Sequence, residues 1–258
     1  MLNIGWFSTG RDEAARQLMQ VAQDNIQRGN IDGKIIFVFS NREPGEARES
    51  DLFFELVRSY NIPLVYLSHK KFKAAETGDA LGIKKEWRTE YDREVDKKIA
   101  LFVPDLCVLA GYMLIVSKEL CQKYDMINLH PAPPGGPTGS WQEVIWTLIR
   151  NEADKAGAMM HLITPELDRG PVISYCRFSI KGDPFAEYWR KDNKDMLFQL
   201  IRQHELAREF PLIILTLQAL SRGKVSIKEG RVTDAQGKLI SGYNLSDQVD
   251  EEVKKNLR

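Results

Sequence analysis

Residues 2–40 read LNIGWFSTGRDEAARQLMQVAQDNIQRGNIDGKIIFVFS, and this stretch decides the fold class. It begins with a short, nearly continuous apolar run at 2–8 and ends with another at 34–40, as expected of strands buried on both faces. Between these runs, apolar residues such as Ala15 and Leu18 fall near one face of a helix. A strand, a helix and a second strand in this order predict one β-α-β unit of a parallel sheet.

The same alternation continues through the first half of the chain. Two further apolar runs lie at 62–68 and 105–111, and charged segments with helical spacing lie at 47–60 and 87–102. We therefore predict an α/β protein with an open, doubly wound, mostly parallel, Rossmann-like sheet. Ligands of such sheets bind at the carboxyl ends of the strands, so the loops that follow the strands are where function is expected.

The second half of the chain changes its pattern. After a loop, the spacing predicts a helix at 140–151, strands at 156–164 and 170–180, a long helix at 194–223 and a hairpin at 224–241. We expect one domain over 1–221. Residues 222–258 are expected to form a hairpin and a charged tail that extend this domain without making an independent one.

Composition limits the classes of partner. The 36 basic residues balance 36 acidic ones, so no overall field favours nucleic acid or an anionic membrane. The three cysteines are widely spaced and predict neither a disulfide framework nor a zinc site. The start of the chain has no signal-like segment, and no apolar run is long enough to span a bilayer. We expect a soluble, cytoplasmic protein that acts on small molecules.

One group of polar residues has the composition of a catalytic site. The stretch NLHPAPPGG at 128–136 places Asn128 and His130 two residues apart at the end of a short apolar run, so both side chains point to one side of a strand. In LITPELDRGPVIS, Asp168 lies in a turn between two predicted strands. An amide donor, an imidazole and a carboxylate that raises the imidazole's pKa form a working set for acyl transfer. A polar strand end with a satisfied histidine, and an aspartate that merely forms a turn, are the competing interpretations.

Together with LNIGWFSTG, WRTEYDREV, PDLCVLAGYMLIVS, MINLHP, GAMMHLITPELDRGPVI and HELAREFP, these motifs resemble the folate-dependent formyltransferases, in order from about residue 2 to about residue 221. The resemblance implies that Asn128, His130 and Asp168 are catalytic, and that no metal takes part. It implies a formyl donor, 10-formyltetrahydrofolate, and a primary amine as acceptor. The folate pocket is expected from this resemblance at Arg88, Met113, Leu114, Ile115, Val116, Asn128, Thr164 and Glu166.

The acceptor side departs from the family pattern. The family's first strand usually ends in a glycine-rich loop whose N–H groups receive a phosphate, whereas this chain has FSTGRDEAARQ. The acceptor residues implied are Ser8, Thr9, Gly10, Arg11 and, in the late helix, Glu205. Acidic residues in this loop are equally typical of an ordinary first helical turn.

Three acceptors stay open. Glycinamide ribonucleotide comes first, another amine such as an amino sugar nucleotide comes second, and water, which would make the protein a formyltetrahydrofolate hydrolase, comes third. A homodimer is possible under this resemblance. The segment 181–195 extends past the family core. Its sequence leaves open whether it lines the acceptor site or forms an exposed surface segment.

Overall fold

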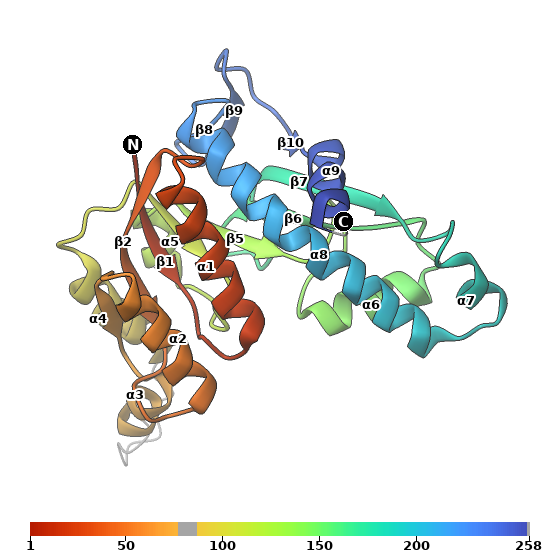
Figure 1. The fold of residues 1–258 in the computed structure, drawn as a ribbon. Coiled ribbons are helices and arrows are strands. Elements are labelled where there is room, and N and C mark those ends of the chain that lie inside the picture. Colours follow the sequence, from red (N-terminus) through yellow and green to blue (C-terminus); the bar gives the residue numbers. More distant parts are fainter. Residues whose placement is uncertain (77–86, 257–258) are drawn as a thin grey trace. The chain divides into compact units, whose positions relative to one another are not determined.

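A computed structural model describes residues 1–76 and 87–256 of the chain (Figure 1). The chain divides into two compact units. The first unit contains Met1–Asn128 and Ile163–Pro165, and the second contains Leu129–Leu162 and the chain from Glu166 onward. The predicted division at 221 is a different kind of boundary, set by the length of the family core, and it stays a prediction.

The first unit is built on parallel strands. They are β1 (Leu2–Phe7), β2 (Gly33–Ser40), β3 (Leu64–Tyr66), β4 (Leu106–Leu109) and β5 (Met126–His130), in the spatial order β3-β2-β1-β4-β5. The chain moves outward from β1 to β3 and then returns to the other side of β1, which is the reversal of a doubly wound sheet. The predicted fold class is confirmed, and the strands lie where the apolar runs placed them.

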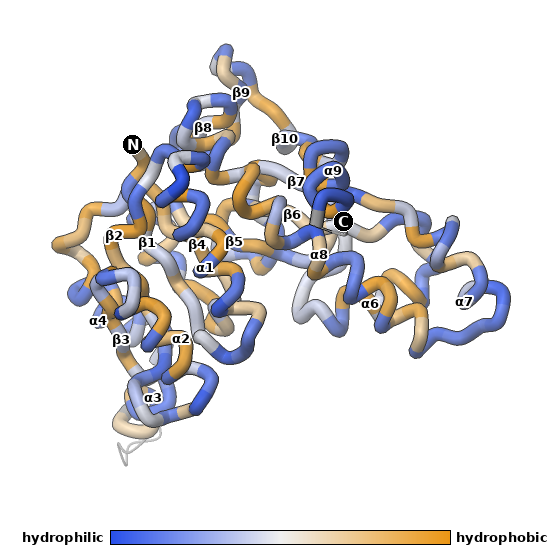
Figure 2. Tube along the Cα trace, viewed as in Figure 1, coloured by the Kyte–Doolittle hydropathy of each residue, from blue (hydrophilic) through white to orange (hydrophobic). Residues whose placement is uncertain are grey.

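Helices follow these strands. They are α1 (Glu13–Gln27), α2 (Arg48–Ser59), α3 (His69–Glu76), α4 (Trp87–Ile99) and α5 (Lys118–Lys123). Helices α4 and α5 contribute Tyr91, Val95 and Leu120 to a core that also holds Phe7 and Phe39 from the strands. The strands are predominantly hydrophobic in Figure 2, as their burial on both faces requires.

The second unit contains a smaller group of strands. Strand β6 (Lys155–Leu162) is antiparallel to β7 (Val172–Ser179), and β10 (Tyr243–Asn244) is parallel to β7. The predicted hairpin is confirmed as β8 (Val225–Lys228) paired with β9 (Arg231–Asp234).

Four helices accompany these strands. They are α6 (Trp141–Arg150), α7 (Ala186–Arg190), α8 (Lys194–Ser221) and α9 (Ser246–Asn256). Ser140 and Glu143 form a capping box at the start of α6, which explains why the helix begins there. The charged tail forms α9.

Aromatic residues of the segment 181–195 pack against the core of the second unit. Phe185, on the loop before α7, is 2% exposed, and Tyr188 and Trp189 of α7 pack against the same apolar cluster as α6 and α8. The indole N–H of Trp189 donates to the carbonyl of Ile180 at 2.5 Å. The segment is therefore anchored by its aromatic side chains, while most of its residues are exposed, and its role at the acceptor site stays a prediction.

Candidate active site

His130 is the last residue of β5 and is 2% exposed. Its Nε2 lies 2.9 Å from the carbonyl oxygen of Pro137. A carbonyl only accepts hydrogen bonds, so Nε2 carries the proton and donates it to this oxygen. The Pro- and Gly-rich loop that follows β5 thus folds back over the imidazole it introduces.

Asp168 lies in the turn between β6 and β7, with φ of 53°. Aspartate is among the few residues that adopt this left-handed conformation at low cost. Its Oδ2 is 3.6 Å from Nδ1 of His130 and accepts the backbone N–H of Gly139 at 3.0 Å. The structure therefore brings two of the three predicted catalytic residues together within the second unit.

His161 is a member of this site that the sequence interpretation missed. It lies near the end of β6, is 1% exposed, and its Nε2 is 3.6 Å from Oδ1 of Asp168. Its Nδ1 donates to the carbonyl of Leu162 at 2.8 Å. The signal that would have found it is a lone histidine inside the apolar run AMMHLIT, because a buried polar side chain in a strand requires a partner.

The electrostatics of the pair correct one expectation. Burial lowers the pKa of His130, and this effect outweighs the hydrogen bond to Pro137 and the attraction of Asp168, which both raise it. The expectation that Asp168 raises the pKa of His130 above its ordinary value is therefore not met in the protein without substrate, because desolvation has the larger effect. Burial also raises the pKa of Asp168, but hydrogen bonds from His161 and Gly139 bring it below its usual value.

Asn128 ends the long N-terminal segment of the first unit and precedes His130 by two positions in β5. It pairs in register with Leu109 of β4. Its assignment as an amide donor stays a prediction.

The predicted folate wall follows β4. Met113 and Ile115 are each 49% exposed, whereas Val116 is buried and Leu114 packs against the core of the first unit. Nη1 of Arg88 donates to the carbonyl of Ile115 at 3.3 Å. An apolar surface with two exposed side chains is the kind of wall that a flat ring can lie against.

The remaining predicted folate residues belong to different units. Thr164 lies in the short segment Ile163–Pro165 of the first unit, and Glu166 belongs to the second unit. Their assignment to the folate pocket stays a prediction.

The loop after β1 lies beside the predicted folate wall. Ser8 and Thr9 are buried, and Oγ1 of Thr9 accepts the N–H of Met113 at 3.0 Å. Gly10 has φ of 60°, and a Cβ there would lie 2.8 Å from the ring of Phe53. Residues predicted for the acceptor and for the donor are thus in contact within the first unit.

The charged side chains of this loop already have partners within the loop and the first turn of α1. Arg11 pairs with Asp12 at 3.1 Å, and the Asp12 side chain accepts the N–H of Ala15 as the N-cap of α1. Glu13 is the acidic residue of the first turn. These contacts favour the interpretation of Asp12 and Glu13 as helix-starting residues.

Glu205 lies in α8 and is fully buried. Neither carboxyl oxygen has a hydrogen-bond partner among the described residues. Burial raises the pKa of Glu205 well above its usual value, and the nearby Glu209 raises it further. As a substrate contact, Glu205 stays a prediction.

Residues 1–76 and 87–256 contain neither a metal-binding cluster nor a membrane-spanning helix. No group of three or more His, Cys, Asp or Glu side chains in that part of the chain is placed to hold a metal ion. Within the same part, no helix has the length and apolar character needed to cross a membrane.

The chain thus contains a parallel α/β unit and, in the second unit, a buried pair of a histidine and an aspartate, residue types that serve as acids and bases in enzymes. A family model described as formyl transferase matches residues 6–189, and the chain belongs to this family and is a transferase. Phosphoribosylglycinamide formyltransferase of Escherichia coli K12 is 28% identical over 203 residues, which are 76% of this chain and 79% of that protein.

Two further likenesses support the assignment. Formyltetrahydrofolate deformylase of Haemophilus influenzae is 30% identical over 174 residues, which are 65% of this chain and 52% of that protein. The structure of phosphoribosylglycinamide formyltransferase from Coxiella burnetii has a TM-score of 0.70 at 23% identity, covering 94% of this chain and 98% of that one. This last likeness concerns the fold.

Proposed function

We propose that the protein transfers the formyl group of 10-formyltetrahydrofolate to the primary amine of glycinamide ribonucleotide, a step of purine synthesis. The observation that carries the proposal is the buried His130–Asp168 pair, 3.6 Å apart, in a chain of the formyl transferase family. The name of the E. coli relative supports this acceptor.

The proposed chemistry is direct attack. The amine nitrogen bonds to the formyl carbon, whose carbonyl oxygen becomes an oxyanion, and the bond from this carbon to N10 then breaks. Nε2–H of His130, which donates to Pro137 in the structure, turns to the oxyanion together with the amide of Asn128. Developing negative charge raises the pKa of His130, so the imidazole takes up, through water and Asp168, the proton that the attacking amine loses, and it returns this proton toward N10 as the bond from the formyl carbon to N10 breaks.

Asp168 has two tasks in this proposal. Its carboxylate faces Nδ1 of His130, where a second ring proton would be held, and thereby stabilises the imidazolium. It also passes the proton of the attacking amine, through water, toward the departing N10. His161 helps to keep Asp168 ionised, because its ring lies 3.6 Å from that carboxylate and lowers the carboxylate's pKa.

The donor is proposed to lie along Met113 and Ile115, which expose apolar side chains, with Arg88 beside them. Leu114, Val116, Thr164 and Glu166 complete the proposed pocket. The acceptor is proposed to meet Ser8, Thr9, Gly10 and Arg11.

Two other acceptors have specific support. Arg11 is paired with Asp12, which departs from a loop built to receive the phosphate of glycinamide ribonucleotide and is the ground for a different amine. An amino sugar nucleotide would have to place its own phosphates elsewhere. The likeness to the H. influenzae deformylase favours water.

A screen of acceptors tests these proposals. The protein is given 10-formyltetrahydrofolate with glycinamide ribonucleotide, with an amino sugar nucleotide, or with no amine, and release of tetrahydrofolate is followed. We expect release with glycinamide ribonucleotide alone. Release only with the amino sugar nucleotide would transfer the proposal to that acceptor, release without amine would make the protein a hydrolase, and no release at all would refute formyl transfer.

We also propose that residues 1–221 form the catalytic domain, with 222–258 as its extension, and that the protein acts in the cytoplasm, as a homodimer if it associates. The family assignment supports the cytoplasmic setting.

A further inference from the structure

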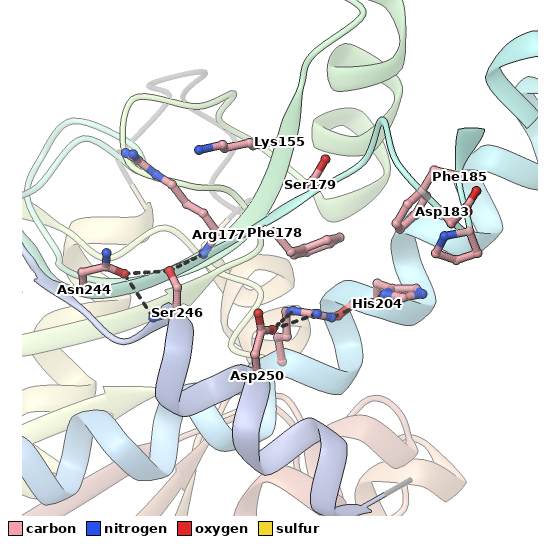
Figure 3. Close-up of a pocket in the computed structure, with 12 residues that line it drawn as sticks. Lys155, Arg177, Phe178, Ser179, Asp183, Phe185, His204, Asn244, Ser246 and Asp250 are labelled. Atoms are coloured by element: carbon pink, nitrogen blue, oxygen red, sulfur yellow. Dashed lines mark hydrogen bonds and ion pairs between the residues drawn. The ribbon is translucent and has the colours of Figure 1, made fainter. Parts of the chain in front are cut away.

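A second pocket lies in the second unit, apart from the His130–Asp168 pair. Its volume is about 550 Å³, which is in the range of small-molecule sites. Strands β6 and β7, the loop before α7, helix α8 and the start of α9 supply its walls (Figure 3).

The pocket and the catalytic pair lie at opposite ends of β6. Lys155, which lines the pocket, is the first residue of the strand, and His161, which contacts Asp168, is near its end. Six residues of extended chain separate them by about 20 Å, since a strand rises about 3.3 Å per residue. The pocket therefore belongs to a different site.

One end of the pocket is cationic. Lys155 pairs in register with Ser179, and Gly157 pairs with Arg177, so the side chains of Lys155 and Arg177 extend from the same face of these strands (Figure 3). Neither cation has an ion-pair partner in the described parts of the chain. Arg177 lies over the ring of Tyr175 at 4.8 Å, which holds the guanidinium in place without neutralising it.

The wall on α8 is aromatic and electrically balanced. Arg208 pairs with Asp250 at 2.9 Å and lies over Phe178 at 4.3 Å. His204 packs against Phe185, with ring centroids 4.9 Å apart. This wall offers a ring surface and no net charge.

An acidic residue marks the other end. Asp183 lies beside Phe185, away from Lys155 and Arg177 (Figure 3). The pocket thus offers two free cations, then rings, then a hydrogen-bond acceptor.

We propose that this pocket binds a phosphorylated small molecule of nucleotide size. Arg177 and Phe178 follow one another in β7 and point to opposite faces, and Phe178 packs against Arg208 and His204. The ligand therefore lies across the edge of β7 beyond Tyr175, where the pairing with β10 ends. Its phosphate lies against Lys155 and Arg177 on one face, its planar group lies against His204 on the other, and its N–H or O–H donors face Asp183. A nucleoside monophosphate has all three parts in this order, whereas a simple dianion leaves Asp183 facing negative charge.

Calorimetric titration of the full chain with AMP tests the proposal, with ribose 5-phosphate, adenosine and inorganic phosphate as separate titrants. We expect AMP to bind most tightly, and its affinity to fall with added salt. The double variant Lys155→Met/Arg177→Met should lose roughly tenfold or more in AMP affinity, because charge-assisted hydrogen bonds are lost.

A matched control removes two cations of the same unit elsewhere. Lys228 and Arg231 pair across the β8–β9 hairpin, outside the pocket, so Lys228→Met/Arg231→Met should bind AMP as the parent does. Equal loss in both double variants would overturn the proposal, as would no binding of AMP. Equal binding of ribose 5-phosphate and AMP would overturn the placement of the ring.

The variant His130→Ala distinguishes AMP binding in this pocket from AMP binding at the catalytic site. This variant should bind AMP with unchanged affinity, and a loss would overturn the proposal of a second site. Formyl transfer by the Lys155→Met/Arg177→Met variant should be normal, so failure of the pocket and failure of the proposed function give different results.

Discussion

The central feature at the scale of residues is a carboxylate between two buried imidazoles. His130 and His161 each donate one ring N–H to a backbone carbonyl and turn the other nitrogen toward Asp168. A proton that enters either ring at the second nitrogen is therefore met by a negative charge. This arrangement favours an imidazolium in the transition state, although burial lowers the pKa of His130 in the protein without substrate.

His130→Ala and Asp168→Asn should each lower turnover by roughly 100-fold to 1000-fold, the usual cost of removing one oxyanion donor or its support. Steady-state rates with the acceptor found in the screen provide the measurement. Circular dichroism should report an unchanged fold. Normal turnover in either variant would contradict the assigned roles.

The pKa of His130 should lie below 6.5, because burial outweighs Asp168. NMR titration of the imidazole protons measures it. Asp168→Asn should lower this pKa further, since the carboxylate raises it, and His161→Gln should raise it, since His161 lowers it. A His130 pKa above 6.5 in the parent protein would refute the dominance of burial.

At the scale of elements, helix α8 contains a buried carboxyl group, that of Glu205. Glu205 has a raised pKa in the folded protein and an ordinary one, near 4.5, when unfolded. The contribution of Glu205 to the stability of the folded protein is therefore most favourable below pH 4.5. This stability is lost as the pH rises from 4.5 toward the pKa that Glu205 has in the folded protein. At neutral pH, the buried Glu205 therefore lowers the stability of the folded protein.

Glu205→Gln should therefore raise the free energy of unfolding at pH 7, because the variant removes an acid whose pKa burial raises, and the gain should vanish below about pH 4.5. Urea unfolding at several pH values measures the difference. Glu251→Gln, on the exposed surface of α9, is the control and should change stability little. A gain that persists at pH 4 would argue against the buried acid as its cause.

The pairing of β6 with β7 depends on a close approach at Gly157. A Cβ at this position would lie 2.1 Å from the carbonyl oxygen of Cys176. Gly157→Ala should lower the free energy of unfolding by about 3 kcal/mol, because the strands must separate. Gly182→Ala has open space and serves as the control in the same unfolding measurement; equal effects would be inconsistent with the clash.

At the scale of the whole molecule, each unit has its own apolar core. A buried free thiol lies in each unit, Cys107 in the first and Cys176 in the second, while Cys121 is partly exposed. Burial raises the pKa of all three thiols, that of Cys176 to about 12.

Labelling with a thiol reagent at pH 8 should therefore modify only Cys121 in the folded protein, and slowly, since the thiolate is the reacting form. All three thiols should react in denaturant. Mass spectrometry of the labelled peptides identifies them. Rapid labelling of Cys107 or Cys176 without denaturant would mean that the unit holding it opens readily.

Much of the molecule was predictable from local pattern. Apolar runs such as KIIFVFS identify buried strands, because a strand covered on both faces needs apolar residues throughout. The motifs around His130 and Asp168 identified that pair, because their chemistry is carried by the residue types themselves. The role of 181–195 was not predictable, since nothing in that segment says which surface its aromatic residues cover.

By itself, the sequence determined the order of strands and helices, the family, and the identity of the His–Asp pair. Only the tertiary structure decided that burial lowers the pKa of His130, that His161 lies beside Asp168, and that Lys155 and Arg177 line one pocket. Burial, distance and strand register depend on residues far apart in the chain, and they fix the free energy of each charge. Local sequence carries the kind of side chain, and folding sets its surroundings.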